Sequence, residues 1–148
     1  MISDDQAVMD RALVMAREAL DAGDHPYGAV LIGAPGEVAE RNRVVSTIDP
    51  TAHAEMMAIR TAAAAWGSLA LAGSTMYATF EPCPMCFGAI LEAGVARLVI
   101  GARRRVGDPP LGDYTVEALA ALTGRSPEIS LVTGPPESPV TKFYTSVA

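Results

Sequence analysis

His53-Ala54-Glu55 and, further along the chain, Pro82-Cys83-Pro84-Met85-Cys86 carry the strongest structural information in this sequence. Together they offer one imidazole and two thiolates, which are three ligands for a tetrahedral zinc ion. Three protein ligands leave the fourth coordination position open for water, whose pKa the metal lowers toward neutrality. The pattern therefore predicts a catalytic zinc site with His53, Cys83 and Cys86 as ligands and Glu55 beside them to move protons.

The spacing within these motifs indicates helix N-termini. Cys83 and Cys86 are three residues apart, so on a helical turn their side chains project from nearly the same face. The two prolines of the segment suit a first helical turn, where no amide hydrogen is needed. His53 and Glu55 are two residues apart and can share a site only at a helix end. We therefore expect the metal over two helix N-termini, where the helix dipoles favour thiolate.

The residue inventory favours metal binding over other uses of the cysteines. Both cysteines of the chain lie in the Cys-x-x-Cys, and the only other histidine is His25, for which we expect an exposed loop position. A redox dithiol or a pair of core cysteines is the alternative interpretation. The His-x-Glu upstream favours zinc, and two metal-spaced cysteines with no others indicate a reducing compartment.

Length and composition suit one domain covering residues 1–148, with enough hydrophobic residues to bury a substantial core. No apolar stretch reaches membrane-spanning length, and the N-terminus lacks the basic start of a secretory signal, so we expect a cytoplasmic protein with no membrane partner. Eleven basic against seventeen acidic residues give a net charge of −6, which disfavours nucleic acid as a partner. The one basic cluster, Arg103-Arg104-Arg105, is most simply a solvated loop or a subunit contact, and a nucleic-acid patch or a contact with a phosphate-bearing substrate are the alternatives.

Hydrophobic periodicity predicts an alternation of strands and helices. A capping box at Ser3-Asp4-Asp5-Gln6 predicts a first helix that stops at Gly23. Further helices are expected over 52–66, 84–93 and 116–122, strands over 27–32, 37–42, 75–79, 97–100 and 129–132, a hairpin turn at 33–36, a loop over 103–112 and no regular helix in the proline-rich stretch 134–139. The alternation predicts an α/β fold, with parallel crossovers and with both metal motifs at strand-to-helix joints.

The chain resembles the cytidine deaminase superfamily, in its branch of nucleobase and tRNA adenosine deaminases. The resemblance covers about residues 8–102 and is carried by residues 49–60, 75–77, 81–90 and 26–30. His-x-Glu with Pro-Cys-x-x-Cys is the signature of zinc deaminases. The resemblance implies a three-layer α/β/α fold, with a central mixed five-stranded sheet and helices on both faces, and one Zn²⁺ per chain.

This resemblance also implies hydrolytic deamination of an amidine-like ring carbon. Glu55, which is not a zinc ligand, would pass a proton from water to the ring nitrogen and help protonate the departing ammonia. Asn42 matches the asparagine with which family members contact substrate, although a turn-favouring asparagine is the alternative. The Ala54 backbone is a substrate contact by resemblance. Tyr27 is a candidate for stacking on a planar base, or is simple core.

The substrate has several candidates. Residues 49–51 and Pro84 resemble bacterial guanine deaminases, which read the purine with an acidic residue from the C-terminal third. Asp113 is the possible counterpart, and a helix-capping aspartate is the alternative. In that group an aromatic C-terminal segment closes the pocket, as Phe143-Tyr144 would here. Segment 103–148 follows the guanine deaminase pattern only loosely and is also similar to fungal-type cytosine deaminases.

Two other readings are weighed against a free-base deaminase. tRNA adenosine deaminases share the core motifs but usually add a basic C-terminal helix, whereas residues 140–148 carry one lysine. We therefore favour a small-molecule substrate, a nucleobase or related amino-heterocycle. A non-catalytic zinc subunit is the least favoured reading, because Glu55 is present. The apolar residues of the helices over 52–66 and 84–93 exceed what one sheet face needs, and the family commonly forms dimers, so we expect a homodimer.

Overall fold

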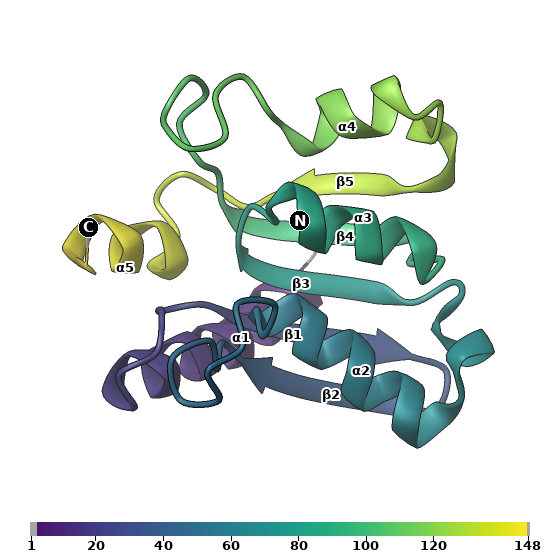
Figure 1. The fold of residues 1–148 in the computed structure, drawn as a ribbon, viewed down its shortest axis with the longest axis horizontal. Helices are drawn as coiled ribbons and strands as arrows, with labels where there is room; N and C mark the ends of the chain where they lie inside the picture. Colours follow the sequence, from purple (N-terminus) through teal and green to yellow (C-terminus); the bar gives the residue numbers. More distant parts are fainter. Residues whose placement is uncertain (1–2, 148) are drawn as a thin grey trace.

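The computed structural model describes residues 3–147, which form a central five-stranded sheet in the order β2-β1-β3-β4-β5 (Figure 1). The strands are β1 (Gly28–Gly33), β2 (Gly36–Arg41), β3 (Thr75–Phe80), β4 (Arg97–Ala102) and β5 (Ser130–Thr133). β1 pairs antiparallel with β2 and with β3, whereas β4 pairs parallel with β3 and with β5. The predicted mixed sheet and its parallel crossovers are confirmed.

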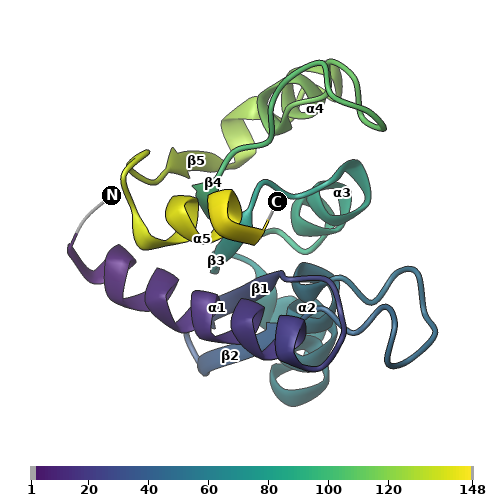
Figure 2. The ribbon, with the colours of Figure 1, turned by 90° about the vertical axis from the view of Figure 1, so that its left-hand side faces the viewer.

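Helices cover both faces of this sheet, which confirms the predicted three-layer arrangement (Figure 2). They are α1 (Ser3–Asp21), α2 (Ala54–Trp66), α3 (Pro84–Glu92), α4 (Val116–Leu122) and α5 (Pro139–Val147). α2, α3 and α4 lie on one face, and α1 and α5 on the other. Within the described residues, no helix is both long and apolar enough to cross a bilayer.

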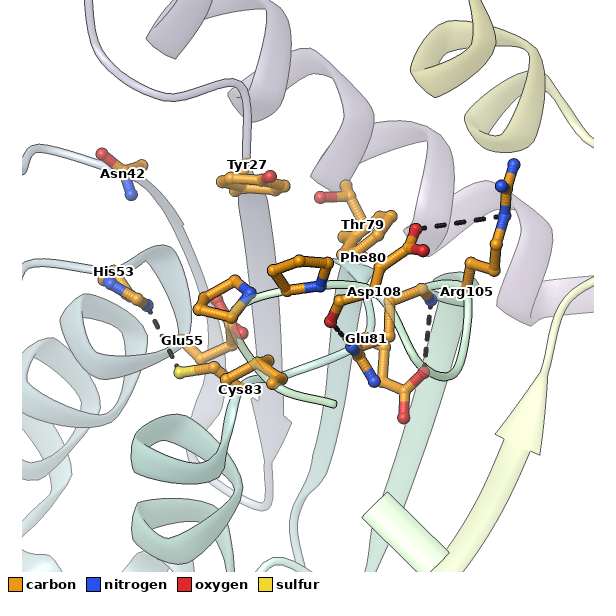
Figure 3. Close-up of a pocket in the computed structure, with 14 residues that line it drawn as sticks. Tyr27, Asn42, His53, Glu55, Thr79, Phe80, Glu81, Cys83, Arg105 and Asp108 are labelled. Atoms are coloured by element: carbon orange, nitrogen blue, oxygen red, sulfur yellow. Dashed lines mark hydrogen bonds and ion pairs between the residues drawn. The ribbon is translucent and has the colours of Figure 1, made fainter. Parts of the chain in front are cut away.

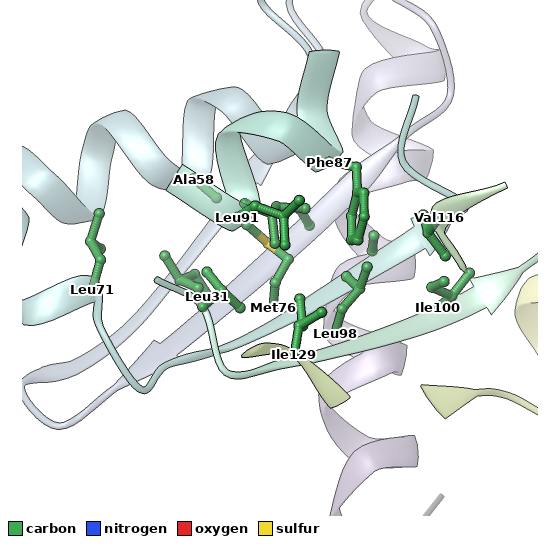
Figure 4. Close-up of a cluster of buried hydrophobic side chains, with 14 of the residues drawn as sticks. Leu31, Ala58, Leu71, Met76, Phe87, Leu91, Leu98, Ile100, Val116 and Ile129 are labelled. Carbon is green, nitrogen blue, oxygen red and sulfur yellow. The ribbon is translucent and has the colours of Figure 1, made fainter. Parts of the chain in front are cut away.

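The strands feed two hydrophobic clusters because successive side chains point to opposite faces. In β1, Leu31 joins the cluster beneath α2 and α3, whereas its neighbour Val30 joins the cluster beneath α1 and α5. The first cluster packs Phe87 of α3 against Met76 and the other buried strand residues (Figure 4). Both clusters are continuous along the sheet, so they fix the strand ends from which the loops of the site emerge.

One contact between α1 and the sheet requires a glycine. A Cβ at Gly28 would lie 2.1 Å from the carbonyl oxygen of Ala12 and 2.7 Å from the amide nitrogen of Ala16. No side chain fits between the strand and a helix backbone this close. Gly28 thus allows α1 to pack directly on β1, next to Tyr27.

The structure corrects three expectations about the elements. α2 begins at Ala54 rather than at 52, because His53 is its extended N-cap. The C-terminal region contains a helix, α5, that the sequence did not predict. Only 134–138 are non-helical, and Pro139 begins the helix, as its fixed φ allows. Short 3-10 helices at Ser68–Leu71 and Ser126–Glu128 were also not predicted. The predicted capping box depends on the Ser3 side chain, which lies outside the described part of the chain.

Candidate metal centre and substrate cavity

Two helix N-termini bring the three predicted zinc ligands together. His53 is the N-cap of α2, and Cys83 is the N-cap of α3, both in extended conformation. Cys86 follows in the first turn of α3. Neither N-cap side chain makes a capping hydrogen bond. All three therefore face the space in front of the helices, where the positive ends of the helix dipoles favour anionic ligands.

The ligand atoms are spaced as a tetrahedral zinc requires. Nδ1 of His53 lies 3.7 Å from Sγ of Cys83 and 3.4 Å from Sγ of Cys86. All three atoms lie within 4.8 Å of one another. Tetrahedral zinc, with Zn–N of about 2.0 Å and Zn–S of about 2.3 Å, places nitrogen and sulfur ligands about 3.6 Å apart. These residues thus fit a zinc ion without rearrangement.

The acidities of the two thiols also favour a metal ion at this position. The hydrogen bond from Cys86, followed by that from His53, lowers the pKa of Cys83 to about 4. The partner thiol behaves oppositely, because its contact with Cys83 and then burial raise the pKa of Cys86. Two sulfurs this close hold one negative charge readily and a second one only beside a cation. A metal ion between them supplies that cation and deprotonates both.

Glu55 lies in the first turn of α2, with only 7% of its surface exposed. Burial raises the pKa of its carboxyl to about 7. A carboxyl with this pKa accepts and releases protons near neutral pH, as a general acid–base group must. The residue also lines the cavity in front of the three ligands.

The cavity has a volume of about 560 Å³, within the range of small-molecule sites (Figure 3). Its walls come from the start of β1, the end of β3, the N-termini of α2 and α3, and the loop after β4. The lining residues are Tyr27, Asn42, His53, Glu55, Thr79, Phe80, Glu81, Cys83, Arg104, Arg105, Asp108, Pro109, Pro110 and Leu111. A planar bicyclic heterocycle fits this volume.

Asn42 and Tyr27 both reach the cavity wall. Asn42 directly follows β2 and is almost fully buried. Its Oδ1 accepts a hydrogen bond from the amide of Val44, so it is also the turn residue of the alternative interpretation. Among the described residues, no acceptor bonds its Nδ2, which leaves that donor for a ligand. The Tyr27 ring stacks on Tyr144, with centroids 5.7 Å apart.

Tyr144 supports Tyr27 from behind rather than closing the cavity. Its hydroxyl lies 2.8 Å from the carbonyl oxygen of Pro26 and 2.6 Å from Oγ1 of Thr79, and its ring packs edge-on against Phe80. It is not among the lining residues. α5 therefore reaches the site through the aromatic ring that it holds in place.

Three further residues can be placed. Ala54 is fully buried at the start of α2, between His53 and Glu55, but does not line the cavity. Asp113 is exposed and lies outside the cavity lining, so this geometry gives no support to a substrate contact. It does not cap α4 either, because Thr115 does so by accepting from the Ala118 amide. His25 is exposed in its loop, as expected.

The arginine cluster differs from the solvated loop of the simplest interpretation. Arg103 bonds Glu81 and Glu117. Arg104 donates to backbone carbonyl oxygens, and Arg105 alone is largely exposed, at 85% of its side chain. Sequence reasoning also missed Glu81, although a signal was present. Glu81 follows β3 and the arginines follow its parallel neighbour β4, and such strand ends meet at one edge of a sheet.

The sequence matches the profile of one family, described as the cytidine and deoxycytidylate deaminase zinc-binding region, over residues 2–102. It is 42% identical over 100 residues to the tRNA-specific adenosine deaminase of Haemophilus influenzae, covering 66% of this chain and 58% of that protein. The chain spans less than two thirds of the length of this and other curated relatives that it matches.

Solved structures of two kinds share the fold. One comes from a study of A-to-I editing by tRNA deaminases at the wobble position, with a TM-score of 0.76 and 34% identity over 89% of this chain and 100% of that chain. The other is the guanine deaminase of Nitrosomonas europaea, with a TM-score of 0.78 and 26% identity over 95% of this chain and 82% of that chain.

Proposed function

We propose that this chain, which belongs to the cytidine and deoxycytidylate deaminase family, is a zinc-dependent deaminase that releases ammonia from a free nucleobase or a related amino-heterocycle. A guanine deaminase-like activity is favoured, and cytosine is the other free base to test. We further propose that residues 1–148 act as one catalytic domain.

The proposed chemistry assigns a role to each group at the metal centre. His53, Cys83 and Cys86 hold the zinc, which when bound supplies the Lewis acidity that activates a water molecule. Glu55 takes a proton from that water and delivers it to the ring nitrogen beside the carbon under attack. The same carboxyl then takes the remaining proton from the oxygen that the water has added to the ring carbon and passes it to the amino group, which leaves as ammonia. A buried carboxyl whose pKa is raised to about 7 is suited to both transfers.

We assign substrate binding to the part of the cavity lined by Asn42 and Tyr27. Asn42 offers its Nδ2 as a donor to a ring nitrogen or carbonyl oxygen. The backbone of Ala54, which lies between His53 and Glu55 at the start of α2, is proposed as a contact by resemblance to the family and not from the cavity lining. Tyr27 provides an aromatic face, held by Tyr144, along one side of a planar ring. These three contacts suit an amino-substituted heterocycle and include no charged partner.

The observation that carries the free-base proposal is that two of the three arginines beside the cavity are already bonded to groups of the protein itself. Arg103 is paired with two carboxylates, and both terminal nitrogens of Arg104 donate to backbone carbonyls. Only Arg105 of the cluster projects largely into solvent. A net charge of −6 adds no general attraction for a phosphate backbone. tRNA adenosine deamination is the second candidate, because a tRNA deaminase structure and a tRNA-specific relative are both similar to this chain.

The test is ammonia release by the zinc-loaded protein. The panel contains guanine, cytosine, adenine, their nucleosides, other amino-heterocycles and a tRNA anticodon stem-loop. Turnover of a free base supports the proposal, whereas turnover of the stem-loop alone supports the second candidate. If no substrate is turned over, the reading as a non-catalytic zinc subunit gains support.

A variant pair tests the proposed proton carrier. Glu55→Gln should lower the rate by about 10²–10⁴-fold, the range for loss of a general acid–base group, with zinc content unchanged. Glu92→Gln is the matched control, because that carboxylate is largely exposed and lies far along α3. An active Glu55→Gln enzyme would refute the assignment.

We also propose a homodimer through the face formed by α2 and α3. An apolar groove there is lined by Ile59, Ala63, Leu69, Ala89 and Ala93, among others, and the Leu69 side chain is almost fully exposed. Such a contiguous apolar surface is typical of a subunit contact. A monomer by light scattering at micromolar concentration would contradict the proposal.

A further inference from the structure

Glu81 is a buried carboxylate directly before the Pro-Cys-x-x-Cys motif, and it is not among the proposed ligands or proton carriers. Its side chain has no exposed surface. One oxygen accepts from Nε of Arg103 at 2.8 Å and from the amide of Arg104 at 3.3 Å. The other accepts from Nη2 of Arg103 at 3.2 Å and from the amide of Val116 at 3.1 Å. Three of the four donors belong to Arg103 and Arg104, at the start of residues 103–115, and the fourth belongs to Val116, directly after them. We call residues 103–115 the wall segment.

The wall segment is tied together by the same group of residues. Nη1 of Arg104 donates to the carbonyl oxygen of Tyr114 at 2.7 Å, and its Nη2 donates to that of Asp108 at 2.7 Å. Both nitrogens also reach the carbonyl oxygen of Gly112 at 3.1 Å. The Tyr114 hydroxyl donates to the carbonyl oxygen of Pro82 at 2.7 Å. The segment is therefore fastened at both ends to the two residues that precede Cys83.

The same segment forms one side of the cavity. Arg104, Arg105 and residues 108–111 all line it, in front of Glu55 and the candidate ligands (Figure 3). Residues 105–110 are exposed, and none of them belongs to either hydrophobic cluster. Because core burial does not hold this stretch, its position depends on polar contacts at its ends. Glu81 makes four of them.

We propose that Glu81 is a positioning residue for substrate recognition, which fixes the wall segment and thereby sets the shape of the cavity that receives the heterocycle. The alternative is that Glu81 only stabilises the fold through a buried ion pair. The two differ in what fails when the carboxylate is lost. A positioning residue affects substrate fit and the local order of 103–115, whereas a fold-stabilising residue affects the whole domain. The effect on substrate rests on the proposed function; the effect on the wall segment does not.

The experiment compares Glu81→Gln with the wild type in the zinc-loaded protein. The arginines of the wall segment supply trypsin sites, so cleavage after Arg103, Arg104 and Arg105 reports its local opening. We expect faster cleavage at these sites only, unchanged zinc content, and a KM raised roughly tenfold with a much smaller change in kcat, which corresponds to about 1.4 kcal/mol of lost binding.

Two further variants keep the test decisive. Glu117→Gln removes the outer partner of Arg103 and leaves every Glu81 contact in place, so it should behave much like the wild type. Arg103→Lys removes the two-pronged contact with Glu81 while keeping the charge, so it should reproduce Glu81→Gln even if that variant folds poorly.

Two results would overturn the inference. One is wild-type cleavage and KM in both Glu81→Gln and Arg103→Lys. The other is uniform acceleration of cleavage across the chain with loss of zinc, which shows a purely fold-stabilising role. If the wild type deaminates nothing, the cleavage pattern still decides whether Glu81 holds the wall segment, so failure of the proposed function is recognised separately.

Discussion

Gly28→Ala is expected to push α1 away from the sheet. The added methyl group would meet the carbonyl oxygen of Ala12 at 2.1 Å, the amide nitrogen of Ala16 at 2.7 Å and Cβ of Met15 at 2.8 Å. Ordinary contacts to a methyl group begin at about 3.4 Å, so the helix has to retreat by roughly 1 Å. Two of the three atoms are helix backbone and cannot rotate out of the way.

The size of the effect follows from what α1 buries. Met9, Ala12, Leu13 and Ala16 are almost inaccessible and pack in the cluster that contains Val30. A gap of about 0.5–1 Å forfeits a quarter to a half of each dispersion contact across it. Overpacking a core costs about 1–3 kcal/mol, and a clash with rigid backbone belongs at or above the upper end. A loss of about 3 kcal/mol lowers the Tm of a domain of this size by about 6–12 °C.

The assay is thermal and urea unfolding of the zinc-loaded protein, with Gly88→Ala as the matched control. Gly88 lies within α3, and an added methyl group there meets nothing within 4 Å. Its replacement should be neutral or stabilising by about 0.5–1 kcal/mol, because glycine is a poor helix former. A Tm for Gly28→Ala within about 2 °C of the wild type would refute the argument from close packing.

Three other outcomes are expected. Removing zinc with a chelator should lower the Tm, since metal at a thousandfold excess over Kd stabilises a fold by about 4 kcal/mol. An unchanged melting curve in calorimetry would contradict the metal assignment. Tyr144→Phe should lower the free energy of unfolding by about 1–3 kcal/mol, because Thr79 and the Pro26 carbonyl lose their hydroxyl partner. The same variant should raise KM if Tyr27 stacks on substrate. Equal KM values would count against that stacking. Hydrogen bonds from the Ser46 amide and the Arg41 guanidinium hold the pKa of Asp24 below its usual range. The contribution of the Asp24 carboxylate to the free energy of unfolding is therefore complete above about pH 4 and is lost as the pH falls further. Asp24→Asn should therefore lower the Tm at pH 7, and melting curves from pH 7 to pH 2 should show the difference from the wild type shrinking; a constant difference would contradict this.

The metal motifs could be predicted because they depend only on the spacing of residues that are close together in the sequence. Cys83 and Cys86 share a helical turn, and the position of His53 two residues before Glu55 is compatible only with a helix end. Spacing alone therefore indicated that all of them lie at helix N-termini, and the structure places them there. The parallel crossovers could be predicted for a similar reason, because alternating strands and helices restrict the connections, whereas the order of the strands was not predicted.

The features that were missed depend on contacts between distant parts of the chain. α5 is rich in valine and threonine, which are weak helix formers, and it is stabilised by burying Val140 and Phe143 against the sheet. The partners of Glu81 lie beyond α3 and β4, so they can be found only from the parallel pairing of β3 with β4 and not from the residues next to Glu81. Asp113 was suggested by resemblance to the acidic residue of guanine deaminases. It lies outside the cavity lining, and its substrate contact stays a prediction.

The wall segment has a consequence for how substrate preference can change. Glu81 holds its two ends, and Arg104 holds the backbone carbonyls of Asp108, Gly112 and Tyr114. The side chains over 106–110 are exposed and take no part in the hydrophobic clusters. Exchanging side chains over 108–110 leaves the core and the metal ligands untouched while altering the lining of the cavity. A combinatorial library confined to these three positions is therefore a compact starting point for changing which substrate the proposed deaminase accepts. Natural substitutions at these positions can likewise change substrate preference without disturbing the core or the metal ligands.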